Sequence, residues 1–508
     1  MKKENLTAGK VYLVGAGPGD LGLITVKGME CLKLAEVVVY DRLVDERMLE
    51  GVRETAERIY VGKSREGHTL TQAGINQLLV EKALEGKTVV RLKGGDSFVL
   101  GRGGEEAEAL VSHHISFEVV PGVISGVAVP AYAGIPVTHR GIAVSFAVIA
   151  GNEDPAKKGS TINWEKLTGG VDTLVFLMGV ENLSKIVDKL LQYGRPSDMP
   201  VAIIMNGTRA NQRTITGTLA GIVSQAEKEE VKPPAIIIVG EVVKLREKIR
   251  WFDNRPLYAK RVLVTRARQQ ASTLSRLLSG LGALPVELPA IDIQPIEDNR
   301  ELDRAIKNIG DYGWVLFTST NGVDAFFNRL HSLRLDARAL KNIKIGAIGP
   351  ATAQSLETRG IIPDYLPAVY TTRGILDGLK KHKVSGQLFL LPRADIADEE
   401  LTEGLRLLGA KVDEVTTYRT IPATEAIARA KKMLKSGEID VITFTSSSTV
   451  TNLVSAFRGE KLEVNGARIA CIGAKTAETA AKAGLKVDIL AREATIPGLV
   501  AAIEEYFA

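Results

Sequence analysis

Short runs of β-branched and aliphatic residues recur along the whole chain, separated by longer stretches with the apolar spacing of helices. Runs of this kind, bounded by glycine and polar residues, are typical of buried strands. We predict strands at 10–15, 36–41, 88–92, 173–178, 235–240, 261–266, 314–319, 344–349, 388–393, 441–446 and 468–473. Because strands alternate with helices, the pattern predicts an α/β fold with mainly parallel sheets covered by helices.

The pattern is interrupted between residues 245 and 267. The segment DNRP at 253–256 is typical of a helix stop followed by a linker. At 508 residues the chain is also long enough for two or more hydrophobic cores. We therefore predict a domain over 1–252, a linker over 253–260 and a second domain over 261–508.

The second domain contains an internal repeat. The matching pairs are 315–327 with 442–454, 345–364 with 469–488, and 262–283 with 388–410. Because the order of the pieces differs between the two copies, one lobe must be built from both ends of this domain. We predict lobe one from 261–290 together with 422–508 and lobe two from 293–415. Two connecting strands and a ligand cleft are expected between the lobes.

Composition and charge narrow the kinds of site that the chain can hold. Cys31 and Cys471 are the only cysteines and lie far apart, which argues against a disulfide scaffold or a thiolate metal site. The six histidines lack the spacing of metal ligands, so no metal site is predicted. We expect no signal peptide, and no apolar run reaches the about 20 residues needed to cross a bilayer. A cytoplasmic protein without membrane contact is therefore expected. The net charge of +5 is spread evenly, which does not support nucleic-acid binding but leaves a small polyanionic substrate open.

The loop after the first predicted strand, in VYLVGAGPGD (11–20), looks like a dinucleotide fingerprint. However, Asp20 stands where a third glycine belongs, and Pro18 removes a backbone donor that a pyrophosphate would use. A second glycine-rich segment, 91–110, also follows a predicted strand, and a third turn lies at 119–126. Three such turns suit a compact nucleoside better than an extended dinucleotide, although each glycine alone is expected only to make a turn.

Six motifs occur in a fixed order between about residues 9 and 252: VGAGPGDLGLIT, VVVYDRLV, VGKSREGHTLTQAGIN, RLKGGDSFVLGRGGEE, VVPGVISGVAVPAYAGIPVTHR and FLMGVENL. In this region the chain resembles the uroporphyrinogen-III C-methyltransferases. The resemblance implies a two-subdomain, tetrapyrrole-methylase-like α/β unit that uses S-adenosyl-L-methionine and no metal. It also implies methylation of uroporphyrinogen III at C2 and C7, which gives precorrin-2, and a homodimer formed through this domain.

The resemblance further implies a set of residues that contact the methyl donor. They are Pro18, Gly94, Gly95, Asp96, Val99, Ile124, Ser125, Met178 and Gly207. Asp96 either binds a ribose or amino group or caps its own turn, and Met178 either lies against the ligand or belongs to the core. The chain departs from the family pattern at Ser97, Ile124 and 150–152, where relatives usually have proline, threonine and Thr-Gly-His.

Asp41 and Lys63 match the proton acceptor and the proton donor proposed for the family. Methylation of a pyrrole carbon redistributes ring protons, so an acid and a base are needed nearby. A mutual salt bridge or a strand-end cap is the alternative for this pair. Candidates for binding substrate carboxylates are Arg42, Arg65, Arg102 and Arg140, because a guanidinium binds a carboxylate in bidentate fashion. Each of these arginines could instead be a solvated surface charge.

Residues 259–508 resemble uroporphyrinogen-III synthase through VLVTRA, FTSTNGV, IGPATA, LLPRA, VTTYRT, TFTSSSTV and IGAKTA, again in order. The reaction implied is closure of the linear hydroxymethylbilane with inversion of ring D. Its product, uroporphyrinogen III, is the substrate implied for the first domain. The whole chain is thus expected to be a bifunctional enzyme of tetrapyrrole biosynthesis.

The synthase resemblance implies a second set of residues at a substrate cleft. Tyr418 matches a tyrosine suggested to assist departure of the hydroxyl group, although packing is the alternative and a phenol is a weak acid at neutral pH. The residues expected to bind substrate are Arg266, Ser319, Thr352, Arg393, Ser446 and Thr476. Hydroxyl and backbone N–H groups at helix N-termini hold carboxylates, but serines in such places also serve as ordinary helix caps.

Two other functions stay open from the sequence. One is a methylase-fold enzyme that acts on ribosomal RNA or on a diphthamide precursor, and the other is a tetrapyrrole-binding protein without catalysis. The sequence also leaves open whether the product is used for sirohaem or for cobalamin.

Overall fold

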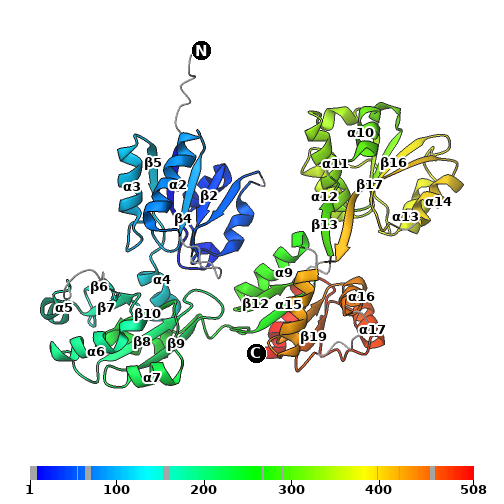
Figure 1. Cartoon of the computed structure of the whole chain (residues 1–508). Coiled ribbons are helices and arrows are strands. Elements are labelled where there is room, and N and C mark those ends of the chain that lie inside the picture. The colour runs from blue at the N-terminus through cyan, green and yellow to red at the C-terminus, as the bar shows by residue number, and fades with distance from the viewer. Residues whose placement is uncertain are drawn as a thin grey trace, which may run out of the picture. The chain divides into compact units, whose positions relative to one another are not determined.

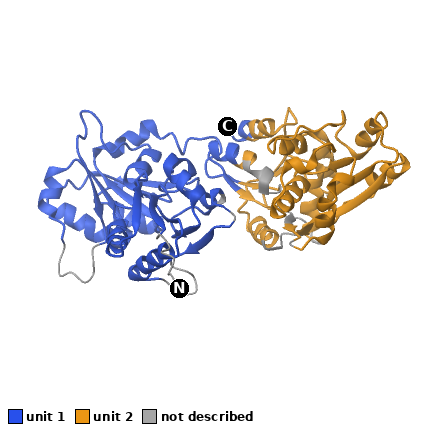
Figure 2. Ribbon diagram, turned by 90° about the horizontal axis from the view of Figure 1, so that it is seen from above, with its two compact units in different colours: residues 1–261, 276–285, 504–508 blue, residues 262–275, 286–503 orange. Residues whose placement is uncertain are grey.

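The computed structural model describes residues 9–53, 55–62, 70–152, 161–265, 268–288, 291–296, 298–397, 399–422, 424–457 and 464–508. The chain divides into two compact units (Figure 2). One unit comprises Met1–Arg261, Arg276–Pro285 and Glu504–Ala508, and the other comprises Val262–Ser275 and Val286–Ile503. Four five-stranded sheets, each covered by helices, confirm the predicted α/β class (Figure 1).

The first sheet is parallel throughout and contains the strands that carry the glycine turns. In spatial order its strands are β3 (Glu57–Tyr60), β2 (Val37–Tyr40), β4 (Val89–Lys93), β1 (Lys10–Gly15) and β5 (Ser116–Val120). Its helical segments are η1 (Leu21–Leu23), α1 (Val26–Leu34), η2 (Glu46–Gly51), α2 (Gln72–Leu84) and α3 (Gly103–Ser112). Alternate strand residues face two different cores, one closed by α1 and the other by α2 and α3.

The second sheet is mixed, although the sheets of the chain are mainly parallel, as predicted. In spatial order its strands are β6 (Phe146–Ala150), β7 (Thr173–Leu177), β10 (Ala235–Val239), β8 (Pro200–Met205) and β9 (Arg213–Thr218). Its helical segments are α4 (Ser125–Tyr132), α5 (Trp164–Gly170), η3 (Val180–Asn182), α6 (Leu183–Gln192), α7 (Ile222–Lys228), η4 (Glu241–Leu245) and α8 (Arg246–Ile249). The short loop 206–212 between β8 and β9 has no room for a crossover helix, so this pair is antiparallel.

The second half of the chain contains the other two sheets. In spatial order one consists of β12 (Leu284–Glu287), β11 (Arg261–Val264), β18 (Val441–Phe444), β19 (Arg468–Cys471) and β20 (Ile489–Leu490). The other consists of β13 (Ile291–Pro295), β17 (Lys411–Pro422), β16 (Leu388–Ala394), β14 (Trp314–Phe317) and β15 (Lys344–Ala347). The helical segments are α9 (Arg268–Gly280), α10 (Arg300–Lys307), η5 (Ile309–Asp311), α11 (Thr320–Ser332), η6 (Ala337–Leu340), α12 (Pro350–Glu357), α13 (Thr372–Leu379), α14 (Glu400–Leu407), α15 (Thr424–Lys435), α16 (Ser447–Ala456), α17 (Ala474–Lys482) and α18 (Ile496–Phe507).

The internal repeat is visible in matching hydrogen bonds of these two sheets. The Ile345 amide donates to Asp364 at 2.7 Å, and the equivalent Ile469 amide donates to Asp488 at 3.0 Å. Each aspartate thereby fixes the start of the strand β15 or β19 in its own sheet. The predicted duplication is therefore confirmed in three dimensions.

The two strands predicted to connect the lobes pair with each other. Strand β13 runs antiparallel to the end of β17, with Ile291 opposite Pro422 and Pro295 opposite Tyr418. This pairing places Tyr418 on the connection itself. None of the helices in the described part of the chain is long and apolar enough to cross a membrane.

The segment predicted as a linker is packed. Leu257 is fully buried, its amide donates to the Leu281 carbonyl at 3.0 Å, and the Ala259 amide donates to Gly282 at 3.2 Å. Just before it, Phe252 stacks under the guanidinium of Arg255 at 3.8 Å from the ring centre. These contacts explain why residues 276–285 belong to the first compact unit.

Candidate functional site

Three glycine turns meet at the carboxyl ends of β1, β4 and β5. The Gly17 amide donates to the Gly95 carbonyl at 3.1 Å, and the Gly95 amide donates back to Gly17 at 2.8 Å. A Cβ atom added to Gly15 would lie 2.6 Å from the Cα of Gly122. Glycine is therefore required here so that the three turns can touch through their backbones. The carboxyl ends of parallel strands are also where ligands bind in open α/β sheets.

Asp96 holds two of these turns together. Its carboxylate accepts hydrogen bonds from the Phe98 amide at 2.7 Å and from the Gly122 amide at 2.9 Å. Of the two roles expected for Asp96, the structure shows the capping role directly. The neighbouring Gly94 lies so close to Leu43 that an added Cβ atom would be 2.7 Å from the Leu43 Cβ.

Several of the other predicted cofactor residues expose apolar surface. Val99 is 40% exposed and Met178 is 54% exposed, so Met178 does not belong to the core. Met178 also has a φ of 57°, a strained value for a residue with a side chain, directly after the buried strand β7. The remaining predicted cofactor residues that are half-buried are Pro18, Gly94, Ile124, Ser125 and Gly207. Exposed apolar side chains beside polar turns are typical of a ligand site.

Asp41 follows β2 and faces the end of β4. One carboxylate oxygen accepts a hydrogen bond from the Leu43 amide at 3.1 Å, and the other lies 3.4 Å from a guanidinium nitrogen of Arg91. The Asp41 side chain is 26% exposed, so it is reachable from solvent while it is held by the protein. Its predicted partner Lys63 lies outside the described residues, as does Arg65.

The predicted substrate arginines of the first half differ in their freedom. Arg102 forms a bidentate ion pair with Glu105, with nitrogen–oxygen distances of 2.8 and 2.7 Å. Arg42 and Arg140 are exposed. Arg102 therefore needs to leave Glu105, or to share it, before it can bind a substrate carboxylate.

In the second half, the structure brings two predicted residues together. The Ser319 hydroxyl lies 3.0 Å from the Tyr418 hydroxyl, and the same serine accepts a hydrogen bond from the Gly322 amide at the start of α11. Tyr418 is only 6% exposed. The burial of the Tyr418 ring fits the packing alternative, and Ser319 holds its hydroxyl beside the N-terminus of α11.

The other predicted residues of the second half lie at equivalent places or in internal contacts. Thr352 and Thr476 are both buried in the helix after the second strand of their repeat. Ser446 caps α16 and lies 2.8 Å from the Ser448 hydroxyl. Arg393 is buried and forms an ion pair with Glu414 at 3.1 Å. Arg266 lies outside the described residues.

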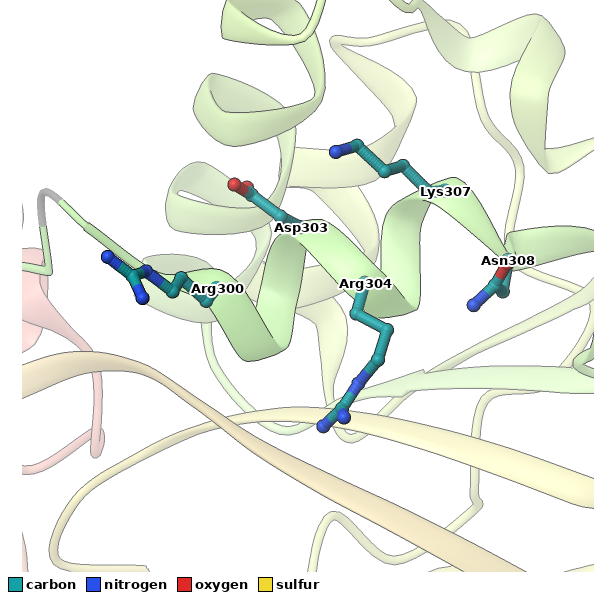
Figure 3. A pocket seen from close by; sticks show the side chains of 5 residues that line it. All are labelled: Arg300, Asp303, Arg304, Lys307 and Asn308. Atoms are coloured by element: carbon teal, nitrogen blue, oxygen red, sulfur yellow. The ribbon is translucent and has the colours of Figure 1, made fainter.

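The described ranges contain no group of three or more His, Cys, Asp or Glu side chains arranged to hold a metal ion. One cavity of about 280 Å³ lies along α10 (Figure 3). It is lined by Arg300, Asp303, Arg304, Lys307 and Asn308. None of the predicted site residues lines this cavity.

Comparisons with known proteins identify both halves. Residues 10–223 match the family model for tetrapyrrole (corrin/porphyrin) methylases, and residues 272–501 match the one for uroporphyrinogen-III synthase HemD. A porphyrin biosynthesis protein HemD from Ruminiclostridium josui is 44% identical over 97% of this chain and 97% of its own length. The chain belongs to this family of fused porphyrin biosynthesis proteins.

The methylase half of this fused family also has shorter relatives. An S-adenosyl-L-methionine-dependent uroporphyrinogen III methyltransferase from Methanosarcina barkeri is 54% identical, over 47% of this chain and 94% of its own length. Among solved structures, uroporphyrin-III C-methyl transferase from Thermus thermophilus with S-adenyl homocysteine is 42% identical. The match covers 47% of this chain and 94% of the Thermus chain, with a TM-score of 0.41.

Three charged residues of the methylase half were missed from the sequence. Arg91, Lys93 and Glu106 are buried to 3%, 6% and 0% exposure, and they lie directly behind Asp41. Burial is the largest influence on Lys93 and lowers the pKa of its ammonium group. Two cations inside the strand run VVRLK were the available signal, because buried strands seldom hold charges without partners.

Proposed function

We propose that the protein is a bifunctional enzyme that closes hydroxymethylbilane to uroporphyrinogen III with ring D inversion and then methylates that product at C2 and C7 to precorrin-2. The observation that carries the proposal is that three glycine turns meet beside Asp41. Leu43 connects the two, because its amide donates to Asp41 and its side chain lies against Gly94. The fused relative and the two family matches support the pairing of the activities in one chain.

We propose S-adenosyl-L-methionine as the methyl donor of the first half, as the name of the Methanosarcina relative states for that protein. The residues present fit such a ligand. Val99 and Met178 offer exposed apolar surface for an adenine ring, and the turn at Asp96 offers a carboxylate and backbone donors for polar groups. When bound, this cofactor supplies an electrophilic methyl group on a positively charged sulfur.

In the methylase half, the protein's own task is to position the substrate and to move protons. Asp41 accepts the proton that the pyrrole ring loses when its methylated carbon becomes tetrahedral. Lys63 donates a proton to the macrocycle as its ring protons are redistributed. Arg42, Arg65, Arg102 and Arg140 bind the carboxylates around the macrocycle. Holding Asp41 through the Leu43 amide and Arg91 keeps its carboxylate in one orientation before the substrate arrives.

In the synthase half, the task is to steer a flexible chain to one ring closure. Tyr418 donates a proton to the departing hydroxyl group, and Ser319 orients the Tyr418 hydroxyl from the start of α11. Arg266, Thr352, Arg393, Ser446 and Thr476 hold the substrate carboxylates. Binding in one folded conformation favours the inverted closure over the spontaneous closure without inversion.

We further propose that residues 1–252 and 261–508 act as the two catalytic domains, with 253–260 as their connection. We propose that the protein acts in the cytoplasm.

A homodimer through the methylase domain is also proposed. Support for it comes from three exposed apolar residues at the edge of the second sheet, namely Ile142, Val144 and Phe146. Sedimentation of the Val144→Lys variant as a monomer, with the parent protein as a dimer, would support this assembly.

One assay tests both activities. The purified protein is incubated with hydroxymethylbilane and methyl-labelled S-adenosyl-L-methionine, and the products are separated. We expect labelled precorrin-2, and we expect Asp41→Ala to stop at unlabelled uroporphyrinogen III. Formation of only the type I macrocycle, without label, would contradict the proposed function.

A further inference from the structure

Behind Asp41 lies a cluster of three buried charges, of which the proposed reaction uses only Arg91. One oxygen of Glu106 accepts hydrogen bonds from Lys93 at 2.7 Å and from Arg91 at 3.2 Å. The same oxygen lies 3.2 Å from the side-chain nitrogen of Gln72, and the other oxygen has no partner among the described residues. Burying three charges is costly, so a cluster retained in the core calls for an explanation.

The cluster reaches Asp41 through Arg91. The guanidinium of Arg91 donates to Glu106 through Nε, to the carbonyls of Val39 and Leu92 through one terminal nitrogen, and to Asp41 through the other. These contacts leave the guanidinium a single orientation. Glu106 therefore acts on Asp41 by holding the group that binds it.

Lys93 acts on the same carboxylate through space. Burial and the neighbouring Arg91 lower the pKa of Lys93, whereas Glu106 and Asp41 raise it. Among the described residues, Glu105 and Arg102 at the start of α3 also face this cluster, and they neutralise each other in an ion pair. The charge that Asp41 meets is thus set by Arg91, Lys93 and Glu106.

We infer that Glu106 and Lys93 are positioning residues of the methyl transfer, which together set the charge that the Asp41 carboxylate meets and so the pH dependence of the reaction. The inference rests on the proposed role of Asp41. With Arg91 and Lys93 balanced by Glu106 and Asp41, the four groups are neutral as a set, and the guanidinium of Arg91 is the cation that lies against Asp41.

The test compares the direction in which two opposite changes of charge move the methylation pH profile of the full-length protein. Glu106→Gln removes a negative charge, so Asp41 becomes harder to protonate and the acidic limb of the methylation pH profile moves to lower pH. Lys93→Met removes a positive charge, so the same limb moves to higher pH. We expect shifts of about 1 pH unit in each direction, typical of a nearby charge, and cancellation in the double variant. Lys93→Arg keeps the charge and should restore the parent profile.

A matched control lies on the edge strand β5 of the same sheet. There Glu118 pairs with Lys10 at 2.6 Å and with Lys27, so it too is one carboxylate between two cations. Glu118→Gln should leave the limb where it is. Calorimetry of each variant shows whether it is folded, and if Glu106→Gln does not fold, the Lys93→Met and Lys93→Arg pair carries the test.

The outcomes separate the inference from the proposed function. If Asp41→Asn methylates with a parental pH profile, the role of Asp41 in the proposed function is wrong. If Asp41→Asn is inactive but the two charge variants shift the limb in the same direction, or not at all, only the positioning role is overturned. Opposite shifts, together with an inactive Asp41→Asn, support both.

Discussion

The two halves of the chain build their candidate sites in different ways. In the methylase half, backbone meets backbone, because Gly17 and Gly95 exchange two hydrogen bonds and Gly15 lies against Gly122. In the synthase half, a hydroxyl does the positioning, because Ser319 lies against Tyr418. A glycine contact admits no side chain, whereas a capping hydroxyl contributes about 1 kcal/mol that a stable domain can lose. The first site is therefore expected to be the more sensitive to substitution.

The largest effect is expected from Gly122→Ala. The new Cβ atom would lie 2.3 Å from the Gly95 carbonyl oxygen, and because this is a backbone atom, the turns themselves would have to shift. We expect a loss of about 3 kcal/mol in the unfolding free energy of the methylase half, typical of overpacking, together with loss of S-adenosylhomocysteine binding. Calorimetry and titration of the ligand measure both.

Gly104→Ala is the control, because nothing lies within 4 Å of the Cβ atom it would carry. We expect it to change stability by less than about 1 kcal/mol, since alanine also favours the helix α3. Equal melting of the Gly122→Ala variant and the parent protein would show that the glycine contact is not required.

The next effect is expected from Tyr418→Phe in the synthase half. The ring keeps its packing, but the hydroxyl that meets Ser319 is lost. We expect cyclisation to slow by about tenfold, below the usual range for general acid catalysis because a phenol is a weak acid at neutral pH. The ratio of type III to type I uroporphyrinogen, read by chromatography, should fall in parallel. A parental rate and ratio would assign Tyr418 to packing alone.

A smaller effect is expected from alanine at Ser319 or Ser446, which lie at equivalent places in the two lobes of the synthase half. Ser319 and Ser446 both cap helices, so alanine at either position should cost about 1 kcal/mol of stability. Of the two serines, Ser319 contacts Tyr418 and Ser446 does not, so Ser319→Ala should slow cyclisation by a few-fold more than Ser446→Ala. Initial rates at matched folded concentrations test this. Equal slowing by both variants would mean that the two lobes contribute alike.

The smallest effect is expected from Ser97→Ala beside the glycine turns. The Ser97 hydroxyl is buried and has no hydrogen-bond partner among the described residues. Removing it should stabilise the methylase half by about 0.5 kcal/mol, because an unsatisfied buried group carries a desolvation cost. Calorimetry against the parent protein measures the change, and a clear destabilisation would indicate a bound water or a missed partner.

Much of the fold could be predicted because it depends on local patterns. The buried strands, the α/β class and the repeat of residues 315–327 at 442–454 all follow from apolar spacing and sequence identity. The antiparallel β8–β9 pair could not be predicted, because pairing direction depends on where the chain returns. Leu257 was assigned to a linker because its neighbours are turn residues, whereas tertiary contacts bury it.

The candidate site was less accessible from the sequence. Tyr418 and Ser319 were each named, but their contact spans 99 residues of chain and follows only from the pairing of β17 with β16 and β13. The two cations inside VVRLK were the only local signal of the buried charges. Their partner Glu106 resembles a surface charge in the sequence, and its burial follows only from the packing of α3 against β4.

The order in which the synthase half is made bears on how it folds. The sheet of β13 to β17 is complete once the ribosome has passed residue 422, so its core can close early. Strand β11 must instead wait for β18, its partner from residue 441 onward, with almost the whole other lobe synthesised in between. During that interval the edge of β11 that β18 later covers is unpaired on the nascent chain, and unpaired strand edges favour misfolding.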